Sequence, residues 1–177
     1  IRYNLKGTKR GRWLQQIPHP NYNGPMLFPR NLILLRSFIV RGTSMEPNFV
    51  EGERLLVHPR WSSIVRNTVV VVREPGKPDR KLLKRVVGVP GESVEFKEGS
   101  IWIDDQHLPE QSLNSLPAVI GLAGASWDLG CDELFVMGDN RAHSTDSREF
   151  GPLNIDNIVG VVVFRYWPIM RWGRIRE

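Results

Sequence analysis

The sequence predicts a mainly β fold built from antiparallel sheets. Its 177 residues are rich in Val and Ile and include 16 Gly and 13 Pro, a composition that favours short strands and turns. Helix patterns are few, and Gly or Pro interrupts most of them. Hydrophobic residues make up 41% of the chain, which is enough for one domain with a buried core.

Short apolar or alternating runs mark the predicted strands, at 54–58, 68–73, 81–89, 94–97, 100–105, 133–137 and 158–166. The run Thr-Val-Val-Val-Val-Arg at 68–73 is typical of a strand buried on both faces. The Pro- and Gly-containing segment 74–79 makes 68–89 a predicted hairpin. A second hairpin is expected where Glu98-Gly99 joins two alternating runs.

These runs divide the chain into three parts. Residues 37–88 and 133–177 form the predicted β core, and residues 89–132 form a small inserted lobe of one hairpin and loops. Residues 1–36 are a basic N-terminal arm that could be the remnant of a membrane-proximal segment. No stretch reaches the roughly 18–20 apolar residues that span a bilayer, and the apolar segment 26–40 is expected to be a short helix or strand near an interface.

Positive charge is concentrated at the two ends of the chain. The net charge is +5, residues 1–41 contain no acidic residue, and three arginines surround Trp172 in the last seven residues. Such ends suit an anionic membrane surface or nucleic acid, and a solvated basic arm is the simpler alternative. The single cysteine, Cys131, excludes an intramolecular disulfide. The four histidines have no metal-ligand spacing, so no metal and no cofactor is expected.

Two segments suggest a nucleophile and its base. Ser44 lies in the Gly- and Pro-flanked turn 42–47, and Lys84 lies in an apolar strand. A serine hydroxyl needs a base to take its proton, and a lysine can serve only when burial lowers its pKa from about 10.4 towards neutrality. Each residue alone has a simpler explanation: a turn serine bonded to its own backbone, or a strand lysine that faces solvent.

The polar loop 138–152 favours the catalytic interpretation of Ser44 and Lys84 over these simpler explanations. Asp146 and Arg148 can form a charge-assisted pair within it. A neutral lysine also needs an acceptor that does not restore its charge, and a hydroxyl meets this condition where a carboxylate would raise the pKa. Ser144 is therefore preferred over Asp146 as the direct partner of Lys84.

Three segments together resemble the ordered motifs of bacterial type I signal peptidases (leader peptidases). They read Gly-Thr-Ser-Met-Glu-Pro, Lys-Arg-Val-Val-Gly-Val-Pro-Gly-Glu and Gly-Asp-Asn-Arg-Ala-His-Ser-Thr-Asp-Ser-Arg-Glu-Phe-Gly-Pro, and the resemblance covers about residues 36–175. It implies a compact Ser–Lys peptidase core in which Ser44 is the acylating nucleophile, Lys84 the general base and Ser144 the residue that orients the lysine. It further implies a supporting charged cluster of Asp146, Arg148 and Arg85, and shallow substrate pockets lined by Val40, Met45, Phe49, Leu82 and Leu83.

The same resemblance implies the reaction and its location. The expected enzyme is a serine endopeptidase that removes N-terminal signal peptides from exported preproteins, after small residues in an Ala-x-Ala-like pattern. The Ser44 N–H would help to bind the oxyanion, whereas Gly42 lacks the hydroxyl that some members supply two residues before the nucleophile. The expected partners are preprotein signal peptides and a membrane surface, with no nucleic acid and no metal. The expected location is the plasma membrane, with the catalytic domain on the extracytoplasmic side.

Two other functions are compatible with the residues alone. Self-cleaving repressor-type proteins use a similar β-rich Ser–Lys core, although no helix-turn-helix pattern is found here. A non-catalytic β domain could instead dock on membranes or nucleic acid through its basic, Trp-bearing ends.

Overall fold

The computed structural model describes residues 34–59, 63–97, 99–109 and 122–175. Most of the predicted basic arm, residues 1–33, lies outside this range. The strands are β1 (Arg36–Ile39), β2 (Arg54–His58), β3 (Val69–Glu74), β4 (Lys77–Gly88), β5 (Ser93–Lys97), β6 (Ser100–Ile103), β7 (Gln106–His107), β8 (Ser126–Asp128), β9 (Glu133–Met137), β10 (Leu153–Asn154), β11 (Ile158–Trp167) and β12 (Gly173–Arg174).

Among the described residues, the helical elements with printed bounds are short: α1 (Ser147–Phe150), η2 (Ile155–Asn157) and η3 (Ile169–Arg171). No helix in the described part of the chain is long and apolar enough to cross a membrane.

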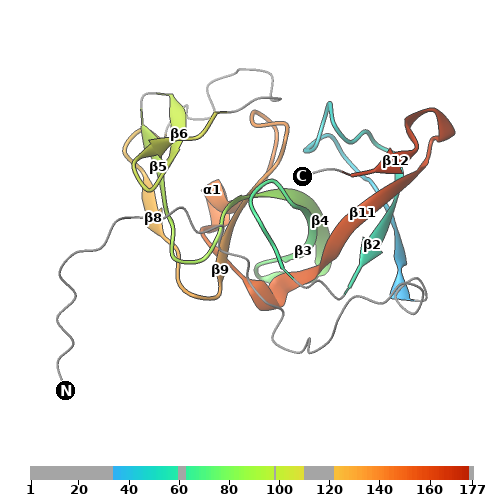
Figure 1. Ribbon diagram of the computed structural model, residues 1–177, viewed down its shortest axis with the longest axis horizontal. Helices are drawn as coiled ribbons and strands as arrows, with labels where there is room; N and C mark the ends of the chain where they lie inside the picture. The colour runs from blue at the N-terminus through green and yellow to red at the C-terminus, as the bar shows by residue number, and fades with distance from the viewer. Residues whose placement is uncertain (1–33, 60–62, 98, 110–121, 176–177) are drawn as a thin grey trace.

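The larger sheet has eight antiparallel strands. Its order is β1-β2-β11-β3-β4-β9-β10, and β12 pairs with β11. Figure 1 shows β3 and β4 curving through the middle of the molecule, while β11 runs beside β2 towards one end. The predicted class, a mainly β fold of antiparallel sheets, is confirmed.

The smaller sheet has four strands in the order β7-β6-β5-β8 and is formed within residues 93–128. Its strands lie at the opposite end of the molecule from β2 and β11 (Figure 1). The hydrophobic cluster under it contains Val94, Phe96, Ile101 and Ile103, together with Phe135 and Met137 of β9. β9 contributes Phe135 and Met137 to this cluster and Leu134 and Val136 to a separate one, and it also pairs with β4. It therefore joins the two sheets.

β3 occupies the centre of the larger sheet, as its valine run predicts. Val70 and Val72 belong to one buried cluster, and Val69 and Val71 belong to another. Successive strand residues face opposite sides of a sheet, so this run contributes to the core on both faces. β3 pairs with β11 on one edge and with β4 on the other. Residues 77–81 of β4 are exposed, and most of the residues after them are buried.

The predicted strands differ from the observed ones mainly at their ends. Arg54–His58 and Glu133–Met137 match, but β4 begins at Lys77 rather than at residue 81. The turn before it is tighter than predicted, because Gly76 adopts a φ of 76°, which only glycine reaches without strain. β8 was not expected in the loop-rich segment 106–132. Its three residues pair with β5, and so short a strand has no local periodicity to reveal it.

Candidate active site

The turn that carries Ser44 joins β1 to β2 and is fixed to the core on both sides. Gly42 has a φ of 75°, in the left-handed region that glycine favours. The buried side chains of Met45 and Phe49 pack in the same cluster as Val40. The Phe49 N–H donates to the Met45 carbonyl at 2.9 Å. Ser44, half-buried, is thus held at a defined position.

Lys84 lies next to this serine on β4. It is opposite Val70 in the β3–β4 register, and only 1% of its surface is exposed. Its Nζ lies 3.0 Å from Ser44 Oγ, although the two residues are 40 positions apart in the chain. The structure therefore brings together the two residues of the predicted pair.

Burial lowers the pKa of Lys84 from 10.5 to about 8, because an apolar environment disfavours the charged amine. Among the charges nearby, those of Asp146 and Asp139 raise this pKa, and those of Arg80 and Arg148 lower it. At pH 7 roughly a tenth of Lys84 is then neutral and can accept a proton.

Each of the two carboxylates near the lysine is paired with an arginine. Asp146 accepts from Arg148, with Nε–Oδ1 at 2.8 Å and Nη2–Oδ2 at 2.9 Å. Asp139 accepts from Arg85, with Nε–Oδ1 at 2.8 Å and Nη2–Oδ2 at 2.7 Å. Bidentate pairs of this kind are short and directional. The guanidinium groups offset negative charge that would otherwise keep Lys84 protonated.

Asp146 remains ionised although it is fully buried. Burial by itself would raise its pKa, but the hydrogen bonds and charge of Arg148 outweigh this effect and lower the pKa. The Gly138 N–H adds a hydrogen bond to Oδ2 at 2.9 Å. Asp146 also accepts from the Arg148 N–H at the start of α1, so one carboxylate fixes both ends of the loop 138–148.

Asp139 belongs to the site but was not singled out from the sequence. Besides its pair with Arg85, it accepts from Asn48 Nδ2 at 2.9 Å, and its N–H lies 3.4 Å from Met45 Sδ. It thus connects the turn of Ser44 to the strand of Lys84. The only signal was its place in the 138–152 motif, since nothing local indicates a strand arginine as its partner.

Ser144 lies beside the serine turn, with its Oγ buried. Its hydroxyl faces Asp146 and helps to lower the pKa of that carboxyl. The expected hydrogen bond to Lys84 is not formed in this arrangement. Gly138 lies directly against it: a Cβ at Gly138 would be 2.1 Å from Ser144 Oγ and 2.5 Å from the carbonyl oxygen of Ser44. The part of Ser144 in orienting the lysine stays a prediction.

The five residues expected to line substrate pockets fall into two groups. Val40, Met45, Phe49 and Leu83 are buried in the cluster beneath the serine turn. Leu82 is half-buried and packs against the cluster on the other face of β4, next to Val70 and Val86. Adjacent strand residues point to opposite faces, which explains why the two leucines separate.

The backbone N–H of Ser44 donates no hydrogen bond to any residue in the described ranges. It is therefore available to an oxyanion formed at Ser44 Oγ. A serine hydroxyl, a buried amine of lowered pKa and a free N–H form the set of groups that a serine hydrolase with a lysine base requires.

Comparisons with known proteins also indicate a hydrolase, and they identify its family. The model of the family described as "Signal peptidase, peptidase S26" matches residues 26–167. Signal peptidase I V of Bacillus subtilis (strain 168) is 36% identical over 138 residues, which cover 70% of this chain and 80% of that protein. Signal peptidase IB of Staphylococcus aureus (strain Mu50 / ATCC 700699) is 32% identical over 161 residues, covering 81% of this chain and 83% of that protein.

A crystal structure of a signal peptidase I from Enterococcus faecalis V583 is similar over 56% of this chain and 97% of that chain, at 27% identity and a TM-score of 0.45. The family match and the two relatives show that the chain belongs to the signal peptidase family, peptidase S26. It is a serine peptidase that acts on signal peptides, and the family predicted from the three motifs is confirmed.

Replacing Gly138 by Ala is expected to lower activity roughly a hundredfold. The added Cβ would meet the backbone of Ser44 at 2.5 Å, so the serine turn must shift, and a shift of about 1 Å at a reacting group costs on the order of 10²-fold in rate. Initial rates of preprotein processing measure the effect. Gly130→Ala is the matched control, because its Cβ would meet only the flexible Glu133 side chain, at 3.2 Å. Equal rates for the two variants would contradict this account of Gly138.

Proposed function

We propose that Ser44 is the nucleophile and Lys84 the general base of a signal peptidase that cleaves exported preproteins after small residues. The observation that carries this proposal is the 3.0 Å contact between Ser44 Oγ and the amine of a lysine that is only 1% exposed. In this proposal the eight-stranded sheet is the catalytic core, and residues 89–132 are an inserted lobe.

The reaction begins when the neutral Lys84 amine takes the proton of Ser44 Oγ. In this form the hydroxyl donates to the Nζ lone pair. The oxygen then attacks the scissile carbonyl carbon, and the resulting oxyanion accepts from the Ser44 N–H. Lys84 passes its proton to the departing amine as the peptide bond breaks, which leaves an acyl ester on Ser44. Water attacks this ester while Lys84 takes its proton, and the proton returns to Ser44 Oγ as the acid is released.

The oxyanion depends on backbone donors in this chain. Gly42 has no side-chain hydroxyl, and its N–H lies 3.3 Å from Glu51 Oε1. The Ser44 N–H is the donor nearest to the reacting oxygen that is free of a partner among the described residues. In the same proposal Ser144 orients the amine of Lys84, and the pairs of Asp146 with Arg148 and Asp139 with Arg85 keep the surrounding charge balanced.

The substrate is proposed to bind as an added strand along β4. β9 pairs with β4 at Arg85, Val86 and Gly88, so the stretch 77–84 has β3 on one edge and no strand partner on the other among the described residues. An extended peptide can hydrogen-bond to such an edge. Val40, Met45, Phe49, Leu82 and Leu83 would then line pockets that admit only small side chains, because most of their surface is already packed.

The proposed location is the plasma membrane, with the catalytic domain on the extracytoplasmic side. Support comes from an exposed apolar surface near the site, here called the apolar tip: Ile39, Trp167, Ile169, Met170 and Trp172. Met170 is 94% exposed and Trp172 is 66% exposed. Arg171 and Arg174 lie among these residues. Apolar and aromatic side chains interleaved with arginine suit the interface of an anionic bilayer.

The first test removes each member of the pair. Ser44→Ala and Lys84→Met are expected to reduce preprotein cleavage at least about 10³-fold, because one lacks the attacking oxygen and the other lacks the base. Methionine is chosen because it fills the space of a buried lysine stem. Lys97→Met, on β5 of the smaller sheet and away from the proposed substrate edge, is the control. If both folded variants, checked by circular dichroism, cleave at the normal rate, the assignment is wrong.

A second test uses pH. Because only neutral Lys84 can act as base, kcat/KM is expected to rise with pH and to reach half its maximum near the Lys84 pKa of about 8. Arg148→Gln removes a cation and leaves Asp146 unpaired, and both changes raise the Lys84 pKa. The half-maximum should move upward by roughly one pH unit, with a roughly tenfold loss at pH 7.

Arg148→Lys keeps the charge and should move the profile much less. It also serves if the glutamine variant folds poorly, since an unpaired buried carboxylate is destabilising. An Arg148→Gln profile that stays in place, or moves downward, would contradict the proposed electrostatics.

A third test addresses the membrane. Exchanging both Met170 and Trp172 for Ser is expected to weaken binding to anionic phospholipid vesicles at least tenfold, because each buried side chain of this size contributes about 1.5–3 kcal/mol. Vesicle co-sedimentation measures the binding. Ala123→Ser, in an exposed turn before β8, is the control. Unchanged binding by the double variant would remove the apolar tip from the proposal.

A further inference from the structure

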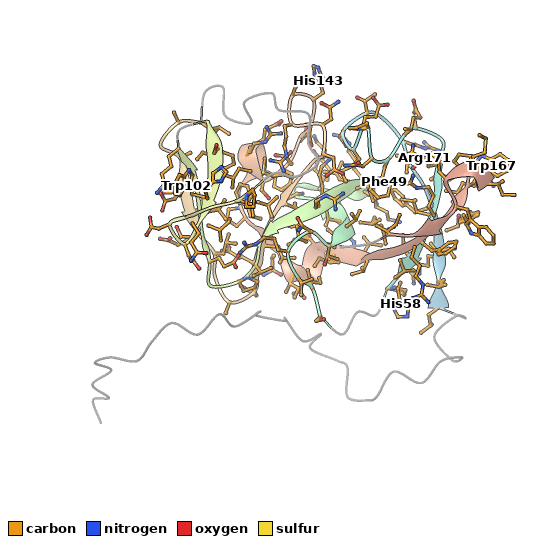
Figure 2. All side chains as sticks on the ribbon, turned by 45° about the horizontal axis from the view of Figure 1, so that its top comes forward. Phe49, His58, Trp102, His143, Trp167 and Arg171 are labelled. Atoms are coloured by element: carbon orange, nitrogen blue, oxygen red, sulfur yellow. The ribbon has the colours of Figure 1, made fainter. Side chains whose placement is uncertain are left out.

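A buried charged cluster lies against the serine turn and includes none of the groups described above for Lys84. Glu53 is 2% exposed and faces two arginines from the C-terminal part of the chain, Arg165 on β11 and Arg171 in η3. Arg171 Nη1 lies 2.6 Å from Glu53 Oε1, and Arg165 Nε lies 3.2 Å from Oε2. Figure 2 shows Phe49, Arg171 and Trp167 at the same end of the molecule, opposite Trp102.

Both guanidinium groups also reach the backbone of the serine turn. Arg171 Nη2 donates to the Asn48 carbonyl at 3.0 Å and lies 3.4 Å from that of Pro47. Arg165 Nη2 donates to the same Asn48 carbonyl at 2.8 Å, and its guanidinium lies 4.8 Å from the centre of the Phe49 ring. Because Arg165 and Arg171 share the one carboxylate of Glu53, their guanidinium groups have further N–H donors for backbone carbonyl oxygens.

These contacts continue to the reacting groups. Asn48 uses its carbonyl for the arginines and its side-chain amide for Asp139, which in turn holds Arg85 next to Lys84. On the opposite side of the turn, the Asn140 N–H donates to the Ser44 carbonyl at 3.0 Å. The turn is therefore tied at Ser44 by the loop 138–148 and at Asn48 by the C-terminal segment.

We infer that Arg171, anchored on Glu53, is a positioning residue for the nucleophile: it holds the Asn48 carbonyl and thereby fixes Ser44 relative to Lys84. Arg171 touches neither the reacting atoms nor the proposed peptide edge, so it acts through the turn. The inference rests on the proposed function of Ser44. Loss of the Arg171 guanidinium should lower the rate of the chemical step. Substrate affinity and the pKa of Lys84 should stay unchanged.

The experiment compares Arg171→Gln with Arg174→Gln in the full chain. Arg174 is also an exposed arginine of the C-terminal segment, and among the described residues its side chain makes no hydrogen bond or ion pair. Arg171→Gln is expected to lower kcat about tenfold, the effect of losing a hydrogen bond to a charged group. KM and the pH of half-maximal kcat/KM should stay unchanged. With a soluble peptide substrate and no membrane present, Arg174→Gln should have the same kcat and KM as the parent chain, so it also controls for the place of both arginines in the apolar tip.

Amide hydrogen exchange gives a readout that does not depend on activity. The N–H groups of Glu46 and Phe49 donate within the turn, to Thr43 and Met45. Both should exchange about tenfold faster in Arg171→Gln than in Arg174→Gln, while the amides of β3 remain protected. This pattern would show that Arg171 holds the turn whatever the Ser44 variant shows about catalysis, so a failure of this inference can be told apart from a failure of the catalytic assignment.

Two results would overturn the inferred role of Arg171. Equal exchange at Glu46 and Phe49 in the two variants would mean that Arg171 does not hold the turn. Faster exchange spread equally over β3 would mean that Arg171 stabilises the whole fold and does not position the serine.

Discussion

The site depends on keeping one amine out of water. Lys84 lies on a strand whose neighbour is buried on both faces, so its stem is surrounded by protein before any catalytic group is considered. Lowering the pKa from 10.5 to about 8 corresponds to about 3 kcal/mol against the charged amine. The folded core must supply that free energy, which explains why Lys84, the proposed base, lies in the buried half of β4.

Burial alone would not suffice, because the same region contains two carboxylates. Asp139 and Asp146 would each favour a protonated lysine, and each is held by a bidentate arginine. The ionised aspartates in turn organise the backbone: Asp146 fixes the loop that lies on the serine, and Asp139 joins that loop to Asn48. The same hydrogen bonds therefore hold the segments of the site together and set the charge around the Lys84 amine.

The serine turn has few hydrogen bonds within itself. Residues from other segments of the chain make most of the contacts that fix it. The loop after β9 ties it through Asn140, and the segment after β11 ties it through Arg171. That last segment also carries the exposed side chains of the apolar tip. The surface proposed to meet the membrane and the arginine proposed to position Ser44 therefore belong to the same short segment of the chain.

The sequence by itself determined the class of fold, most strand positions, the family, and the pair of Ser44 and Lys84. Those features are local: β-branched runs, turn residues and three short motifs. Only the tertiary structure decided that Asp139 pairs with Arg85, that Ser144 Oγ makes no hydrogen bond to Lys84, that Leu82 faces away from Leu83, and that Arg171 reaches the serine turn. Each of these depends on strand register or on segments far apart in the chain meeting in space, and a local pattern carries no information about which distant charge it will face.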